Sequence, residues 1–201
     1  MVSDVTEQMD NLQAIDQLIH KEADELINNK GLHKILLEFG SPHYTGSYAL
    51  RLMTWRDLDI YLEAENISEE KFFELGKKIA SRFQPVKMSY RNERIAKTKG
   101  LPDGLYWGIY LGNEREGAWK IDVWAMDKQE CQQLLDYCNN LLTRISDPER
   151  LKILEIKSKC WKDPLYRKSY TSSDIYSAVL DKGIENFEQF REWLQKILYL
   201  V

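Results

Sequence analysis

The sequence is poor in the residues that cross-link small or extracellular proteins. It contains three cysteines and three histidines among 201 residues. An odd number of cysteines without close pairing does not predict a disulfide framework, and His20, His33 and His43 lack the spacing of zinc ligands. A chain of this length buries enough apolar surface to fold without either kind of cross-link. We therefore expect neither disulfides nor a zinc site.

Long hydrophobic runs and an excess of basic residues are also missing. No stretch approaches the roughly 20 apolar residues that a membrane span requires. The start, MVSDVTEQMDNL, lacks the basic and apolar segments of a signal peptide. The net charge is −4, whereas proteins that bind long nucleic acids usually carry a broad basic surface. We expect a cytoplasmic protein that binds neither membranes nor long nucleic acid.

Hydrophobic periodicity divides the chain into a mixed part and a helical part. Apolar residues recur at three- and four-residue steps over 4–29 and 32–39, which indicates helices, and a third helix follows Ser68. Strand-like segments include LDIYLEAE and the ranges 85–91, 104–111 and 118–126. After residue 127, four helical segments follow. The sequence predicts an α+β fold, with a mixed sheet and flanking helices in 1–127 and a helical domain in 128–201.

One predicted strand carries two acids on the same side. Asp57 and Asp59 are two residues apart, so strand alternation points both to one face, and Leu58 and Ile60 to the other. Neighbouring carboxylates repel each other unless a cation lies between them. Asp122 is the lone acid of the strand-like segment WKIDVWAM, where burying an unpaired carboxylate would be costly. If the two strands are neighbours, three carboxylates converge, and oxygen ligands of this kind suit Mg²⁺.

A Gly-Ser pair precedes these acids at what reads as a strand-to-helix turn. Gly46 and Ser47 stand nine residues before Asp57 and can offer backbone N–H groups and a hydroxyl to a polyphosphate. Simpler interpretations exist for each acid. The Asp-x-Asp pair could lie in solvent, and Asp122 could pair with Lys120 or Arg115.

Together, the Gly-Ser pair, the Asp-x-Asp strand and the later Asp122 resemble the signature of the nucleotidyltransferase fold. The chain is similar over residues 32–126 to small bacterial nucleotidyltransferases, both those that modify antibiotics and the minimal ones of toxin–antitoxin operons. The resemblance implies transfer of a nucleoside monophosphate, adenylate in particular, from a nucleoside triphosphate with release of pyrophosphate. It also implies that Gly46 and Ser47 hold the triphosphate and that Asp57 and Asp59 bind Mg²⁺ or Mn²⁺. Asp122 would complete the metal site or accept the proton of the incoming hydroxyl.

The remaining expectations concern the phosphates and the acceptor. Basic residues gather between 82 and 99, and Lys87 or Arg91 on the predicted strand could reach the triphosphate. The alternative is a solvated basic face. The acceptor expected first is a hydroxyl of a small molecule. The alternatives are a partner protein, as in toxin–antitoxin systems, and an inactive nucleotide-binding scaffold.

Overall fold

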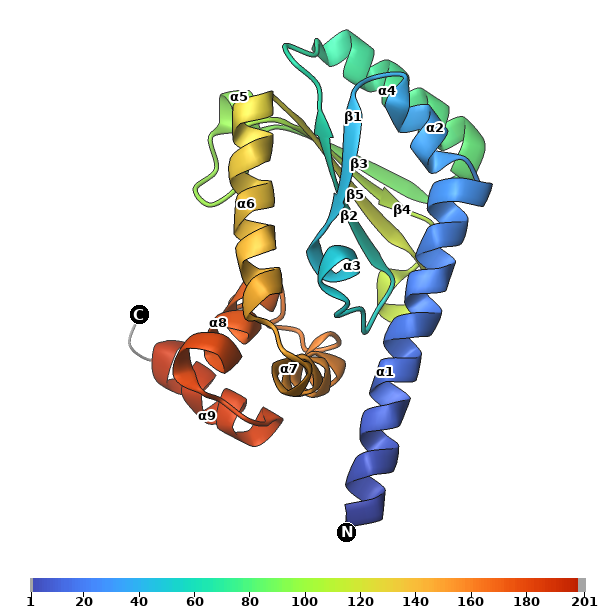
Figure 1. Ribbon diagram of the computed structural model, residues 1–201. Helices are drawn as coiled ribbons and strands as arrows, with labels where there is room; N and C mark the ends of the chain where they lie inside the picture. The colour runs from blue at the N-terminus through green and yellow to red at the C-terminus, as the bar shows by residue number, and fades with distance from the viewer. Residues whose placement is uncertain (1, 199–201) are drawn as a thin grey trace. The chain divides into compact units, whose positions relative to one another are not determined.

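The computed structural model describes residues 2–198, and the side chains of residues 11–197. The protein is an α+β chain with one five-stranded sheet and flanking helices (Figure 1). Its strands are β1 (Ser41–Thr45), β2 (Asp57–Glu63), β3 (Lys87–Asn92), β4 (Leu105–Tyr110) and β5 (Lys120–Met126). Its helices are α1 (Val2–Asp24), α2 (Leu32–Leu37), α3 (Gly46–Leu50), α4 (Glu69–Phe83), α5 (Glu93–Ala96), α6 (Lys128–Arg144), α7 (Asp147–Cys160), α8 (Ser172–Lys182) and α9 (Phe187–Leu198).

The chain divides into two compact units. The sheet unit comprises His20–Leu50 and Arg56–Asn140, and the helical unit comprises Met1–Ile19, Arg51–Trp55 and Leu141–Val201. The expected division into domains at residue 127 stays a prediction.

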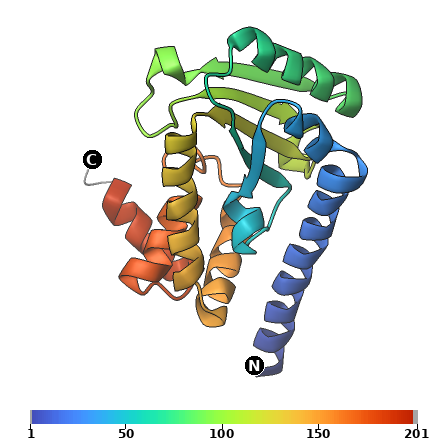
Figure 2. The same ribbon diagram turned by 45° about the horizontal axis from the view of Figure 1, so that its top comes forward.

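The strands of the sheet lie in the order β1-β2-β5-β4-β3 (Figure 2). Strands β2 and β5 are parallel, and every other neighbouring pair is antiparallel. The connection between β4 and β5 is a short 3₁₀ turn, Glu114–Glu116, that Asn113 caps and Gly117 ends with a φ of 93°. The sheet is therefore mixed, as expected, and its one parallel contact joins two strands far apart in the sequence.

The two faces of the sheet differ in polarity because side chains alternate along each strand. One face is apolar: Leu58 and Ile60 of β2 and Ile121 and Val123 of β5 are fully buried. Helices α2 and α4 pack over this face (Figures 1 and 2). Helix α4 begins at Ser68, whose hydroxyl accepts a hydrogen bond from the Lys71 N–H as predicted. The opposite face carries the acids of β2 and β5.

The helical unit has its own core. Helix α7 begins after Ser146 with Pro148 in its first turn, and packs against α8 and α9. Ile153 of α7, Ile175 of α8 and Phe190 of α9 are fully buried. Apolar burial of this kind is the main source of stability for helices of this length.

Two local features differ from the sequence expectations. Residues Glu25–Asn29 form a π-helical turn instead of continuing α1, and α5 was not predicted. The sequence also suggests Asp4 with Glu7 as a capping box for the first helix, with Val5 and Met9 among its apolar residues. These four residues lie outside the described side chains. Within residues 2–198, no helix has the length and apolar character needed to cross a membrane.

Candidate active site

The register between β2 and β5 brings the predicted acids together. Asp59 is directly opposite Asp122, and Asp57 is directly opposite Lys120. Directly opposite residues of neighbouring strands point to the same side of a sheet, so Asp57, Asp59 and Asp122 share one face. We call these three residues the acidic cluster. The condition set by the sequence, that the two strands be neighbours, is met.

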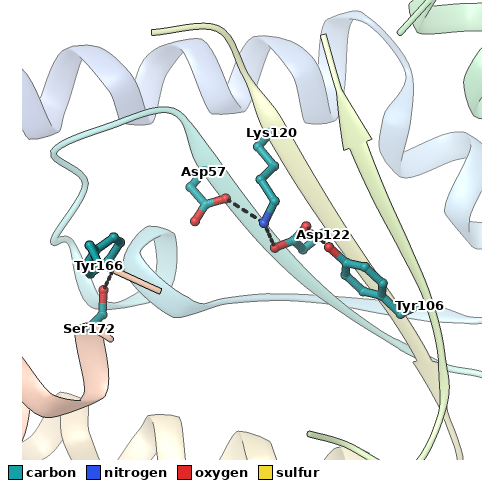
Figure 3. Close-up of polar contacts among 6 residues, drawn as sticks. All are labelled: Asp57, Tyr106, Lys120, Asp122, Tyr166 and Ser172. Atoms are coloured by element: carbon teal, nitrogen blue, oxygen red, sulfur yellow. Dashed lines mark hydrogen bonds and ion pairs between the residues drawn. The ribbon is translucent and has the colours of Figure 1, made fainter. Parts of the chain in front are cut away.

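Lys120 lies between two members of the acidic cluster (Figure 3). Its ammonium contacts Asp122 Oδ2 and lies 3.8 Å from Asp57 Oδ1. Lys120 is only 8% exposed and Asp122 only 9%. From the sequence, a pairing with Lys120 was one alternative for Asp122, and the structure has this contact. Asp122 lies on β5, which is a central strand of the sheet and not an edge strand.

Tyr106 of β4 completes the surroundings of Asp122. Its hydroxyl donates a hydrogen bond to Asp122 Oδ1 at 2.8 Å, so both carboxylate oxygens of Asp122 have a partner (Figure 3). Burial and the Asp122 carboxylate raise the pKa of Tyr106, which keeps the phenol protonated as a donor. Burial raises the pKa of Asp122, and Lys120 opposes that shift. The phenol and the ammonium thus fix the orientation of this carboxylate.

Gly108 leaves the space that Tyr106 needs. It is directly opposite Asp122 across β4 and β5, and a Cβ there would overlap the Tyr106 hydroxyl and fall 2.8 Å from Ser89 Oγ. Sequence reasoning assigned no role to Tyr106 or Gly108. A glycine inside a strand, two residues after a tyrosine, is a signal for such a close approach.

The Gly-Ser pair lies beside the acidic cluster. Gly46 begins α3 directly after β1, and its φ of 59° is in the left-handed region that favours glycine. A Cβ on Gly46 would fall 3.0 Å from Asp59 Cγ and overlap Oδ2. Ser47 follows in the short helix α3, which packs against β2. The structure thus places the Gly46 backbone against Asp59.

We expect Gly46→Ala to impair the site more than the fold. The left-handed backbone should cost about 1 kcal/mol of folding stability, and the new methyl group must displace the Asp59 carboxylate. Gly31→Ala is the matched control, because Gly31 has a φ of 80° but open space around its Cβ. Melting temperatures of the two variants should be similar, whereas affinity for a metal–nucleotide complex should fall only for Gly46→Ala. Equal affinities would show that Gly46 does not position Asp59.

The two basic residues that could reach a triphosphate lie farther from the acidic cluster. Lys87 and Arg91 are on β3, which β4 separates from β5. The Lys87 ammonium lies 4.9 Å from the centre of the Tyr110 ring, and Arg91 Nε lies 3.2 Å from Glu93 Oε1. Strand alternation puts both side chains on the face of the acidic cluster. Their contact with a triphosphate stays a prediction.

The acidic cluster fits a divalent cation by its chemistry and backbone placement. Three carboxylates on one face of neighbouring strands are the hard oxygen donors that Mg²⁺ and Mn²⁺ take. Their side chains are not gathered at ligand spacing, however. Among residues 11–197, the ligand atoms of His43, Glu63 and Cys131 do lie within 4.8 Å of one another.

The His43 group has a simpler explanation. His43 Nε2 lies 3.5 Å from Glu63 Oε2, and both side chains are about one-third exposed. The Cys131 thiol is buried, and burial raises its pKa to about 11. A contact between His43 and Glu63, beside a buried thiol, accounts for these positions, so we assign no metal to them. Tyr166 and Ser172, also drawn in Figure 3, hydrogen-bond to each other within the helical unit.

Comparison with known proteins adds no relative from which a function could be transferred. No protein-family model matches the chain, and no curated protein matches it. A functional proposal for this chain therefore depends on its own residues and their arrangement.

Proposed function

We propose that this chain is a metal-dependent nucleotidyltransferase. It would move a nucleoside monophosphate, adenylate from ATP in particular, to a hydroxyl of a small-molecule acceptor and release pyrophosphate. The observation that carries the proposal is the shared face of β2 and β5, on which Asp59 and Asp122 are directly opposite and Gly46 packs against Asp59. The strand order and the position of the Gly-Ser pair support a nucleotidyltransferase-like fold as the finer assignment of the sheet unit.

The proposed roles follow from the positions of the residues. Asp57 and Asp59 would hold Mg²⁺ or Mn²⁺, and Gly46 and Ser47 would contact the triphosphate. When bound, the ion would supply positive charge to the phosphate oxygens and the leaving group. The acceptor oxygen forms a bond to the α-phosphorus while the bond from that phosphorus to the β-phosphate oxygen breaks. Pyrophosphate leaves with the bonding electrons, and the hydroxyl proton passes to a base, for which Asp122 is the candidate.

A second candidate function is nucleotide binding without turnover. Lys120 favours it, because an ammonium between Asp57 and Asp122 neutralises part of the acidic cluster without a metal ion. The presence of all three carboxylates favours the enzyme instead, since a scaffold has no need to place three acids on one partly buried face.

The test is a screen for transfer. The purified chain is incubated with each α-labelled nucleoside triphosphate and Mg²⁺ against small-molecule alcohols and hydroxyl-bearing proteins, and pyrophosphate is measured. We expect pyrophosphate and labelled acceptor to appear in equal amounts, and neither to form with chelator. A labelled protein instead of a labelled small molecule would identify the partner-protein alternative. Tight nucleotide binding without any release of pyrophosphate would favour the scaffold.

A further inference from the structure

Lys120 is a buried cation whose surroundings are built mainly from acidic and aromatic groups. Its ammonium contacts Asp122, lies 3.8 Å from Asp57 Oδ1 and lies 5.9 Å from the centre of the Tyr110 ring. Lysine is seldom buried to 8% exposure without paired charges. The pairing is therefore the feature that holds this side chain inside the sheet unit.

The same ammonium controls how the carboxylates are arranged. Asp57 and Asp122 point toward Lys120 from opposite sides (Figure 3). Like charges on neighbouring strands repel, and a single positive charge between them lowers that repulsion. A divalent cation held by Asp57 would need its carboxylate, of which Oδ1 now lies 3.8 Å from the ammonium. Two cations cannot occupy that space together.

We infer that Lys120 is an internal cation that competes with the metal ion for the acidic cluster. It occupies the space between Asp57 and Asp122, and it must leave before Asp57 can bind a divalent cation. Lys120 therefore sets the metal affinity of the site. The inference rests on the proposed function, because it assumes that the acidic cluster binds a metal ion. The flexible four-carbon stem of lysine allows the ammonium to move away without a change in the strand.

The experiment measures Mn²⁺ binding without nucleotide, by the electron paramagnetic resonance signal of free Mn²⁺. Lys120→Met removes the charge at similar length, Lys120→Arg keeps the charge, and Lys87→Met is the matched control on the same face at the sheet edge. We expect Lys120→Met to bind Mn²⁺ about tenfold or more tightly than the wild-type protein, within the range by which neighbours of metal ligands alter affinity. Lys120→Arg and Lys87→Met should bind no more tightly than the wild-type protein.

Thermal melts provide a second readout that requires no activity. In chelator, Lys120→Met should melt at a lower temperature than the wild-type protein, because the acidic cluster loses its cation. Added Mn²⁺ should raise the melting temperature of Lys120→Met by more than that of the wild-type protein. If Lys120→Met does not fold, Lys120→Gln makes the same comparison, because its amide can still donate a hydrogen bond to Asp122.

Three outcomes show how the inference and the proposed function stand relative to each other. If the wild-type protein transfers nucleotide but Lys120→Met binds Mn²⁺ no more tightly, the inference is overturned and the proposed function stands. If no variant binds Mn²⁺ and Asp59→Asn binds metal–nucleotide complex like the wild-type protein, both are overturned. If Lys120→Met binds Mn²⁺ more tightly than the wild-type protein, and the double variant with Asp59→Asn loses that binding, the inference and the proposed function are both supported.

Discussion

Asp59→Asn is expected to abolish nucleotide transfer while the fold remains intact. Asp59 is directly opposite Asp122 and lies against Gly46, so it lies closest to the proposed junction of metal ion and triphosphate. A neutral amide binds a divalent cation more weakly than a carboxylate does. We expect transfer to fall by about 10³-fold or more, as when a group that stabilises the transition state is lost.

The stability of Asp59→Asn should stay the same or rise, because one of three neighbouring negative charges is removed. Asp136→Asn is the control, because Asp136 is an exposed acid of α6 that accepts a hydrogen bond from Gln132. Pyrophosphate release and thermal melts decide the result. Asp59→Asn with activity near that of the wild-type protein would remove Asp59 from the site.

Asp57→Asn should differ from Asp59→Asn by lowering the stability of the fold, since Asp57 is a charge partner of Lys120.

Asp122→Asn is expected to reduce both turnover and stability. Asp122 accepts a hydrogen bond from Tyr106 and contacts the Lys120 ammonium. Removing its charge leaves a buried ammonium with one fewer partner, which should cost about 3 kcal/mol of folding stability. If the carboxylate accepts the proton of the incoming hydroxyl, turnover should fall by about 10²–10⁴-fold while nucleotide affinity is nearly unchanged.

The measurement for Asp122→Asn separates binding from turnover at a temperature well below melting. Tyr106→Phe is the companion variant, because it removes a hydrogen bond to Asp122 but keeps the carboxylate. It should lower turnover much less. Weaker metal-dependent nucleotide binding by Asp122→Asn would assign Asp122 as a metal ligand. Turnover and binding like those of the wild-type protein would leave Asp122 with only its structural contacts to Lys120 and Tyr106.

The sequence was sufficient for most of the elements and for the faces of the strands. Alternation with a period of two placed Asp57 and Asp59 on one side and Leu58 and Ile60 on the other, which the burial confirms. The Ser68 cap was also predictable, because local hydrogen bonding determines it. Local sequence signals were enough wherever a residue interacts with residues close to it in the sequence.

Contacts between distant segments could not be predicted in the same way. Whether β2 lies beside β5 depends on tertiary packing. From the sequence alone, this pairing was only a condition for the three acids to converge. A lysine two residues before an acid usually extends into solvent, so the burial of Lys120 had no signal of its own. The hydrogen bond from Tyr106 depends on the register of β4 against β5 and on the absence of a side chain at Gly108.

The central claim is that the acidic cluster and the Gly46 turn together bind a metal–nucleotide complex. Calorimetric titration with an ATP analogue bridged by a methylene group between the α- and β-phosphates tests it without turnover. Because the ion would connect carboxylates to phosphates, we expect binding in Mg²⁺, loss of that binding in chelator, and loss of it in Asp59→Asn. Undiminished affinity for the analogue in chelator would contradict the account.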